Sequence, residues 1–420
     1  MKSRFFFNIS LVENIKNILS IIFFKNQDFD SKLKEKMKFF YNESNFYFFD
    51  YGRTAFYEIL TYIKKNTKKN KILVNSLTLF EIINVIKYLG FEPIFIDNKK
   101  NSFDTNINLE NEENIDDIAA ILITHLNGVN KNILNISNQV KNYNSNNRSK
   151  KIYLIEDCAV SFGAIMNNKY AGSYGDFSFL SFNIMKNITS YTGGALVDNQ
   201  KKIISEVNNY SELSKFDILK KSIFLFTLQL LNNRIFFPLF FRFVRYSQKK
   251  SFNFFLKKYR SDFKVSIEKK FPKKFKYRMH NLQKKILYKQ FEKVLEMQKK
   301  RIAKAKVYYD NLKILKELKF PQTEFTSINS FLEFPIICSS IDVKKKLFEY
   351  LLDNYVDVKN YYYKNCSEEK IYNEGTNICL QSKEISENIL MLPVHEKIEN
   401  SDQKFIIKYI FSFFEKKSQF

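Results

Sequence analysis

Glycine is scarce in this chain of 420 residues, and it is concentrated in one place. Five of the nine glycines fall between Glu156 and Ala195. Glycine is the residue that tolerates a positive φ and a close approach of the backbone to another group. The clustering therefore predicts tight turns packed around a site in this stretch.

Apolar runs that alternate with helical patterns predict the fold around that stretch. Ala119–His125 and Ile152–Ile155 are continuous apolar runs between polar segments, which is typical of parallel strands covered on both faces. Further strands are expected at residues 72–75, 93–97, 177–182 and 195–197, and helices at residues 56–65 and 79–89. This order predicts an α/β fold, with a mainly parallel sheet and helices on both faces.

The pattern changes beyond about residue 255 and predicts a smaller α+β C-terminal domain. Residues 279–315 form one long helical pattern, and residues 142–148 are expected to be a polar surface loop. Strands follow at residues 331–337, and helices at 343–354 and 402–414. The expected organisation is an N-terminal amphipathic segment (1–46), a large domain (47–255) with an apolar insert at about 205–250, and a small domain (256–420).

The net charge of +24 would ordinarily suggest nucleic acid or an anionic membrane as the partner. The chain is rich in Lys, Asn, Ile, Phe and Tyr and has no Trp, which is typical of an AT-rich coding sequence, so many lysines are interpreted as solvated surface residues. No nucleic-acid module is recognisable. The four cysteines form no C-x-x-C pair and the three histidines no zinc pattern, so we expect a reduced cytoplasmic protein without a metal site.

Two apolar stretches, residues 5–24 and 223–244, leave two interpretations open. On a helix, the first stretch has one polar and one apolar face: Ser10, Glu13, Asn14 and Asn17 against Leu11, Ile15, Ile18 and Ile22. The second stretch is interrupted by Asn232, Asn233, Arg234 and Pro238, so neither is expected to span a bilayer. Both stretches either pack on the protein body or a partner subunit, or lie on the inner surface of a membrane.

The glycine-rich stretch carries an acid and a lysine that suit one cofactor. Asp157 ends an apolar strand, at the sheet edge where α/β proteins bind ligands, and Lys186 follows in a Ser-Phe-rich segment. A lysine amine and a carboxylate that faces a pyridine nitrogen are the groups that a pyridoxal 5'-phosphate (PLP) site needs. Ser181 and the turn Gly52–Thr54 are candidates for binding the phosphate. Taken singly, the acid and the turn are explained equally well by ordinary capping.

Together these motifs resemble the DegT/StrS family of PLP-dependent sugar aminotransferases, which have the aspartate aminotransferase-like fold of type I. The segments EDCAVSFGA, AGSYGD, SFNIMKN and TGG are similar to the family pattern in order and spacing. The similarity extends over about residues 47–415, whereas the first forty residues and about 205–270 match poorly.

The resemblance implies that Lys186 bonds the cofactor and moves a proton, and that Asp157 keeps the pyridine nitrogen protonated. It also implies a homodimer in which Lys276 reaches the phosphate of the partner subunit. The residues expected to bind the cofactor are Gly52, Arg53, Thr54, Asp157, Ser181, Lys186 and Lys276.

Two positions depart from the family pattern. Val160 stands where His or Gln is usual, and Leu79, with Phe80 adjacent, falls near the residue that usually stacks on the cofactor. The dehydratase branch has His at the position of Lys186, so the lysine favours transamination. We expect transfer of an amino group, with glutamate as donor, to a keto group of a nucleotide-linked sugar for a surface polysaccharide or glycan. Two alternatives are another PLP-dependent reaction on a sugar, and a non-catalytic protein that keeps the fold for regulation or membrane binding.

Overall fold

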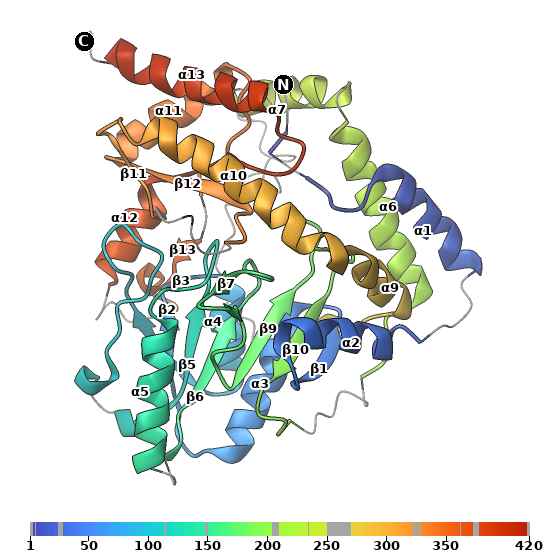
Figure 1. The fold of residues 1–420 in the computed structure, drawn as a ribbon, viewed down its shortest axis with the longest axis vertical. Helices are drawn as coiled ribbons and strands as arrows, with labels where there is room; N and C mark the ends of the chain where they lie inside the picture. Colours follow the sequence, from blue (N-terminus) through green and yellow to red (C-terminus); the bar gives the residue numbers. More distant parts are fainter. Residues whose placement is uncertain are drawn as a thin grey trace.

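A seven-stranded sheet forms the centre of the molecule in the computed structural model (Figure 1). Its order is β1-β10-β9-β6-β5-β2-β4. The strands β4, β2, β5, β6 and β9 are parallel, and β10 runs antiparallel to both β9 and β1. The strand bounds are β1 Asn45–Phe49, β2 Lys71–Asn75, β4 Glu92–Ile96, β5 Ile118–Thr124, β6 Tyr153–Asp157, β9 Phe177–Ser181 and β10 Gly194–Asp198. The predicted mainly parallel sheet is confirmed.

The structure describes most of the chain, in twelve stretches. These are residues 3–4, 6–23, 28–112, 115–147, 150–203, 210–233, 235–249, 270–321, 325, 329–361, 363–372 and 378–417.

The central strands are apolar throughout because both faces of the sheet are covered. All residues of β5 are buried. Its side chains alternate between two clusters: Ile121 and Ile123 pack on one face of the sheet, and Ala120 and Leu122 on the other. This two-sided burial explains why the sequence shows a continuous apolar run instead of alternation.

Helices lie on both faces of the sheet, as predicted. One face packs against α3 (Gly52–Asn66) and α4 (Phe80–Tyr88). The other packs against α2 (Asp30–Tyr41), α5 (Ile133–Asn146) and α9 (Asn281–Gln290).

The predicted surface loop at residues 142–148 is wrong for its first part, because α5 continues to Asn146. The Asn144 side chain donates to the carbonyl of Ile152 at 2.8 Å and accepts from its N–H at 2.8 Å. The Tyr143 hydroxyl donates to Asp116 at 2.7 Å. These contacts with neighbouring segments stabilise a helix end that is polar in sequence.

The C-terminal residues form a small domain around a three-stranded antiparallel sheet, β11-β12-β14. Its elements are α10 Val294–Leu312, β11 Leu318–Lys319, β12 Glu333–Cys338, α11 Ile341–Asp353, α12 Leu380–Asn388, β14 Ile389–Pro393 and α13 Asn400–Lys417. A short 3-10 turn, Phe291–Lys293, separates α9 from α10, so the single long helix predicted at 279–315 is wrong. Four further strands are short: β3 Leu77–Thr78, β7 Ile165–Met166, β8 Lys169–Tyr170 and β13 Lys364–Asn365.

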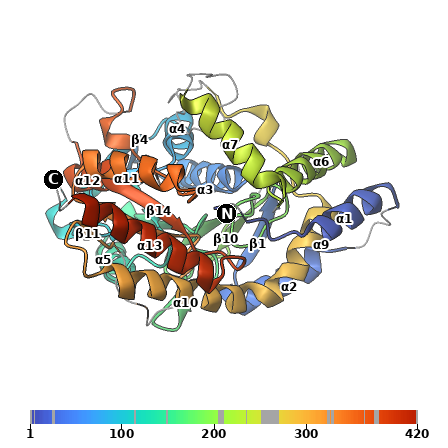
Figure 2. The same cartoon turned by 90° about the horizontal axis from the view of Figure 1, so that it is seen from above.

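The N-terminal helix α1 (Leu11–Phe23) lies beside α6 (Lys215–Leu231), as Figure 1 and Figure 2 both show. Asn14 is fully buried there: its amide donates to the Ser222 carbonyl at 3.0 Å, and its Oδ1 accepts from the Tyr191 hydroxyl at 2.9 Å. Ile15 is 40% exposed. The predicted polar and apolar faces of α1 therefore do not correspond to exposed and buried faces at these two positions, because the amide of Asn14 finds partners inside the protein.

A second helix of the insert, α7 (Phe236–Lys249), packs on the small domain through one face only. Phe237 and Phe241 are buried against Leu352 of α11. On the other face Phe236, Leu239 and Phe243 are 53%, 62% and 56% exposed. Packing on the protein body is thus confirmed for the inner face, whereas the outer face remains in solvent.

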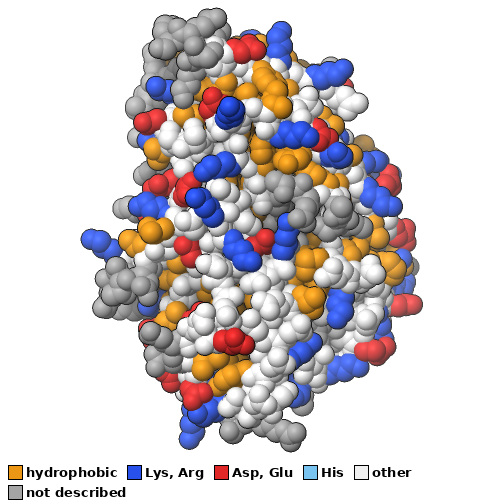
Figure 3. Space-filling view, turned by 60° about the vertical axis from the view of Figure 1, so that its left-hand side comes forward, with side chains coloured by type: hydrophobic (Ala, Val, Ile, Leu, Met, Phe, Trp, Pro, Cys, Tyr) orange, Lys and Arg blue, Asp and Glu red, His pale blue; other side chains and the backbone are white. Residues whose placement is uncertain are grey.

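No single helix in the described part of the chain is long and apolar enough to cross a bilayer. The consecutive helices α6 and α7 reach that length only together, and they are bent by 90°. On the face seen in Figure 3, Lys and Arg side chains are scattered among acidic and apolar ones instead of forming one stripe. All four cysteines are buried free thiols.

Candidate active site

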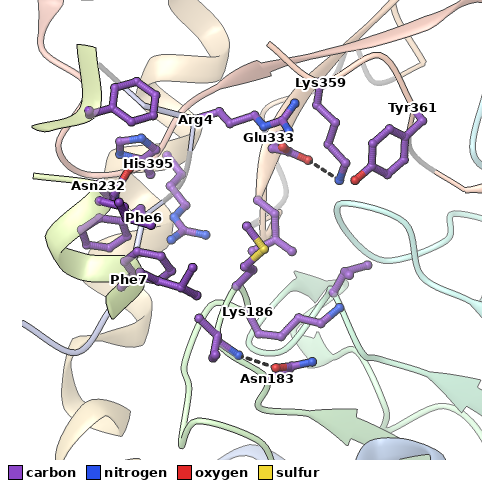
Figure 4. Close-up of a pocket in the computed structure, with 18 of the residues that line it drawn as sticks. Arg4, Phe6, Phe7, Asn183, Lys186, Asn232, Glu333, Lys359, Tyr361 and His395 are labelled. Atoms are coloured by element: carbon purple, nitrogen blue, oxygen red, sulfur yellow. Dashed lines mark hydrogen bonds and ion pairs between the residues drawn. The ribbon is translucent and has the colours of Figure 1, made fainter. Parts of the chain in front are cut away.

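A cavity of about 620 Å³ opens where four parts of the chain meet (Figure 4). The large domain contributes Lys186, the small domain Lys359, the N-terminal segment Phe6, and the insert Phe237. Val160 and Leu79, the two departures from the family pattern, also line it. Lys186, Val160 and Leu79 therefore line a cavity large enough for a small-molecule ligand, whereas Asp157, Ser181, Lys276 and the Gly52–Thr54 turn are not among its lining residues.

Lys186 lies in the turn that follows β9, with its N–H bonded to the Asn183 carbonyl at 3.0 Å. Burial lowers the pKa of its amine to about 8, and the neighbouring Lys359 lowers the pKa further, while Asp157 opposes the shift. An amine with such a pKa is uncharged in an appreciable fraction of molecules near neutral pH. Lys186 can therefore act as a nucleophile.

Asp157 ends β6 and lies close enough to Lys186 for the two charges to interact. Burial raises the pKa of its carboxyl to about 6, against the opposing effects of the Ala159 N–H, Lys186 and His125. The Ala159 N–H donates to Asp157 Oδ1 at 2.9 Å. The structure thus brings together the acid and the lysine that were predicted as catalytic.

Glu156, next to Asp157, has a supporting position that the sequence did not reveal. Its carboxylate accepts hydrogen bonds from the backbone N–H groups of Gly172, Tyr174 and Gly175 at 2.6–2.8 Å. It also contacts His125 Nε2 at 2.7 Å. Successive residues of a strand point to opposite faces, so Glu156 fixes the glycine-rich loop while Asp157 points to the other face of the sheet and interacts with the charge of Lys186. This alternation of side chains along the strand was the signal in the sequence that could have identified the separate role of Glu156.

The predicted phosphate-binding turn begins α3 beside the end of β9. A Cβ on Gly52 would lie 2.7 Å from the Leu180 carbonyl oxygen and 3.3 Å from the Cβ of Ser181. Only glycine allows this approach of the helix start to the strand. The structure therefore brings Gly52 and Ser181 together at a helix N-terminus, which is a place suited to an anion.

The other two residues of the turn have partners within the protein. The hydroxyl of Thr54 donates to the Phe275 carbonyl at 2.7 Å. The guanidinium of Arg53 lies 4.5 Å from the centre of the Phe275 ring and 3.6 Å from Glu81. Lys276 follows, with its Nζ 5.2 Å from the ring centre of Tyr57 on the same helix α3. In this single chain, Lys276 thus lies beside the helix that begins with the predicted phosphate-binding turn.

A buried ion pair next to that turn was missed from the sequence. Lys221 of α6 contacts both carboxylate oxygens of Asp50 at 2.6–2.7 Å and the Thr192 hydroxyl at 2.6 Å. Burial lowers the pKa of the Lys221 amine. The two residues are 171 positions apart, and no local motif connects them. The pair fixes the insert helix beside the Gly52 turn.

The small domain closes the cavity with residues that carry no recognisable motif. Lys359 Nζ and Glu333 Oε2 form an ion pair at 3.0 Å (Figure 4). Tyr361 and Tyr363 line the same side. Burial and the charge of Asp157 raise the pKa of the Tyr363 hydroxyl well above its usual range, so it stays protonated as a hydrogen-bond donor.

The residues present fit the expected PLP. The amine of Lys186 supplies the nucleophile for an aldehyde, Asp157 supplies a buried carboxylate near it, and the helix start at Gly52 offers N–H groups to a phosphate. Each group is on a separate element of the rigid sheet or on its immediate neighbours. This donor set suits a cofactor that carries an aldehyde, a ring nitrogen and a phosphate.

Several curated proteins with similar sequences are sugar-modifying enzymes by name. The chain is 32% identical over 134 residues to "GDP-perosamine synthase" of Escherichia coli O157:H7, which covers 32% of this chain and 35% of that protein. It is 32% identical over 150 residues to "UDP-4-amino-4,6-dideoxy-N-acetyl-beta-L-altrosamine transaminase" of Campylobacter jejuni, covering 35% and 38%. The matches therefore span little more than a third of these relatives' length.

Solved structures share the fold over nearly the whole chain. The Helicobacter pylori aminotransferase PseC is 16% identical with a TM-score of 0.69, and 96% of each chain is covered. The GDP-4-keto-6-deoxymannose-3-dehydratase ColD is 17% identical with a TM-score of 0.70, covering 97% of this chain and all of the other. This similarity confirms the predicted type I fold.

A family model decides the membership. The model of the DegT/DnrJ/EryC1/StrS aminotransferase family matches residues 26–222 and 250–411. It thus spans both domains and includes Asp157, Lys186 and Lys276. The chain therefore belongs to the DegT/DnrJ/EryC1/StrS aminotransferase family.

Proposed function

We propose that the protein is a PLP-dependent aminotransferase that transfers an amino group, with glutamate as donor, to a keto group of a nucleotide-linked sugar. The observation that carries this proposal is the Lys186 amine, buried in a cavity beside Asp157 with a pKa of about 8. Family membership and the names of the similar proteins support the sugar class. The product would enter a surface polysaccharide or glycan.

Different residues of the protein would bind the cofactor, transfer a proton and bind the phosphate. PLP, when bound, supplies an electron sink for the carbon that loses a proton. Lys186 would hold the cofactor through its Nζ, and its amine would take up and return that proton. Asp157 keeps a proton on the ring nitrogen by presenting a buried carboxylate. Gly52, Arg53, Thr54 and Ser181 are the proposed phosphate ligands of the same chain.

We further propose a homodimer in which Lys276 contacts the phosphate of the partner subunit. The support for this role is the family membership, because the family model includes Lys276; in the single chain its amine lies beside Tyr57 of its own α3. A lysine there is a point charge that can approach a phosphate from a neighbouring molecule.

We propose a cytoplasmic location, with the outer face of α7 on the inner surface of a membrane. The exposed apolar row Phe236, Leu239 and Phe243 supports this contact. The helices α1, α6 and α7 carry seven Lys or Arg residues and two acidic residues. Lys221 and Arg245 form ion pairs within the protein, and the remaining excess of basic residues favours an anionic surface.

The test is a screen of nucleotide-linked keto-sugars with PLP and glutamate. Formation of an amino-sugar together with one equivalent of 2-oxoglutarate supports the proposal. If the protein binds PLP at Lys186 and consumes a keto-sugar without oxidising glutamate, another PLP-dependent reaction replaces transamination. Failure to bind PLP would leave the non-catalytic alternative.

A further inference from the structure

The N-terminal residues Ser3, Arg4 and Phe6–Ile9 form a strap beside the cavity, and Arg4, Phe6 and Phe7 of this strap line it (Figure 4). One end of the strap is fixed to the small domain. The backbone N–H of Arg4 donates to Asp357 Oδ2 at 2.9 Å, and its Nη1 donates to the Val358 carbonyl at 2.8 Å. His395, also in the small domain, contacts the Ser3 carbonyl through Nε2 at 2.9 Å.

The other end of the strap is fixed to the loop that carries Lys186. The side-chain amide of Asn8 donates to the Lys186 carbonyl at 2.9 Å and to the carbonyl of Asn187. Ile9, which follows, is buried, and its carbonyl accepts from Gln229 Nε2 at 2.6 Å. One side chain thus bonds two consecutive carbonyls of the lysine loop.

The lysine loop is held on its C-terminal side by Asn187, whose side chain donates to the Phe162 carbonyl at 3.4 Å and accepts from Arg301 Nη1 at 2.7 Å. On its N-terminal side, the Lys186 N–H donates to the Asn183 carbonyl at 3.0 Å, and the Ile184 N–H donates to Asn183 Oδ1 at 2.7 Å. Asn183 and Met185 are exposed to solvent. A bond to two successive carbonyls fixes the orientation of the peptide plane and therefore the direction of the Cα–Cβ bond. A reactive side chain needs such support, because small shifts of its direction cost activity.

We propose that Asn8 is a positioning residue, whose amide holds the backbone of Lys186 so that the lysine amine points into the cavity. The proposal rests on the proposed role of Lys186 as the cofactor lysine. It goes beyond the family match, which begins at residue 26 and leaves the strap outside.

The pKa of the Lys186 amine depends on the position in which Asn8 holds the loop. Its amine faces Asp157 from β6, Glu333 from β12 and Lys359 from the small domain, while Arg4 and Arg301 line the same cavity. Burial is the largest cause of its lowered pKa. If the loop is released, the amine gains access to water, and the pKa rises toward the usual value of a lysine.

The experiment measures the titration midpoint of Lys186 in the protein without PLP. Competitive labelling with trinitrobenzenesulfonate over a pH series, followed by peptide mass spectrometry, gives the midpoint for this residue alone. For Asn8→Ala we expect a higher midpoint. The uncharged fraction of Lys186 at pH 8 should then fall by roughly tenfold for each pH unit of the change.

Two further variants test whether the change in midpoint is specific to the hydrogen bonds of the Asn8 amide. Asn8→Asp keeps the shape but presents a carboxylate to the two carbonyls, and it should raise the midpoint as Asn8→Ala does. Asn311→Ala removes a comparable amide on α10, which donates to the Val307 carbonyl at 2.8 Å, and should leave the midpoint unchanged. A role limited to stability would lower the melting temperature without moving the Lys186 midpoint.

An unchanged midpoint in folded Asn8→Ala or folded Asn8→Asp would overturn the proposal. The wild-type protein separates this failure from that of the proposed function. If the wild-type midpoint is near 8 and the Asn8 variants have the same midpoint, the role of Asn8 is wrong but that of Lys186 stands. A wild-type midpoint at the ordinary value of lysine, with no PLP adduct, removes the role of Lys186 itself.

Discussion

Asp157 and Lys186 are each placed where burial disfavours the charged form. Burial raises the pKa of Asp157 to about 6 and lowers that of Lys186 to about 8. The attraction between the two charges reduces both shifts without removing them. The site therefore holds two groups that destabilise the folded protein when no cofactor is bound, which is common at active sites.

Asp157→Asn should make the protein without PLP more stable at neutral pH. The pKa of Asp157 is higher in the folded than in the unfolded state, so its contribution to stability falls as the pH rises through about 4 to 6. At pH 7 the substitution should add up to about 3 kcal/mol to the free energy of unfolding. The gain should disappear in acid, where both states are protonated. Chemical denaturation at two pH values measures it.

The control for this prediction is Asp310→Asn. Asp310 is an exposed carboxylate whose pKa is lowered by a hydrogen bond to Lys306, so the control should not gain stability at neutral pH. Equal changes in the free energy of unfolding for the two substitutions would mean that burial of the Asp157 carboxylate does not destabilise the folded protein.

The same Asp157→Asn variant should retain PLP but lose most of its turnover. An amide cannot stabilise a proton on the ring nitrogen as a carboxylate does. Absorbance of bound PLP and the rate of 2-oxoglutarate formation measure the two properties separately. Near-normal turnover would show that the carboxylate has been assigned to the wrong role.

At the scale of elements, α7 differs from an ordinary surface helix because it is apolar on two faces. Its inner face packs on α11, and Arg245 forms ion pairs with Glu349 and Asp353 at 3.0 and 2.6 Å. Its outer face repeats large apolar residues at positions 236, 239 and 243, which is the spacing of one helical stripe. Such an exposed row is typical of an interaction surface.

If α7 lies on a membrane, the protein should bind vesicles that contain phosphatidylglycerol, and added salt should weaken the binding. Replacing Phe236, Leu239 and Phe243 by Ser should lower the affinity by at least about a hundredfold, since each burial contributes about 1.5–3 kcal/mol. Phe240 is left unchanged because it lines the cavity. The chain has no tryptophan, so in Leu239→Trp the fluorescence of the single tryptophan would report insertion of this residue into the vesicle.

The matched control replaces three exposed apolar residues elsewhere: Ile314, Leu380 and Phe405. This control should bind vesicles as the wild type does. If the α7 variant keeps its vesicle binding but loses its oligomeric state or its fold, the row contacts a second copy or the protein body instead of lipid.

The elements that sequence could predict are those in which local pattern and tertiary environment agree. The strands β5 and β6 and the helices α3 and α4 were expected within one to four residues of their observed bounds, because their apolar residues are buried where the pattern places them. The motif residues Asp157, Lys186, Gly52 and Ser181 could be predicted to converge, since strand ends and a helix start share one edge of the sheet.

The features that sequence could not predict depend on distant partners. Asn14 is buried because its amide bonds α6 and Tyr191. Lys221 reaches Asp50 from 171 residues away, and Asn8 reaches Lys186 from 178 residues away. A local sequence pattern predicts that polar residues at these positions are exposed, because their hydrogen-bond partners are brought close only by the folded chain.

For the whole molecule, the proposed composite site requires two chains. Lys276→Ala should weaken PLP binding by about ten- to a hundredfold, because a charge-assisted hydrogen bond to phosphate contributes roughly 1.5–3 kcal/mol. The fold should not change, since Lys276 lies at the surface of α3. Equilibrium titration with PLP measures the affinity, and sedimentation measures the oligomeric state. A fully active monomer would contradict both the dimer and this role of Lys276.

The central claim is that Lys186 holds PLP, and borohydride reduction followed by peptide mapping tests it most directly. The wild-type protein incubated with PLP should carry a reduced phosphopyridoxyl group on Lys186. Lys186→Ala should lose the group and remain folded, because no other lysine faces both the cavity and Asp157 in the described part of the chain. An unmodified Lys186 in wild-type protein at saturating PLP, or stable modification of another lysine instead, would contradict the account.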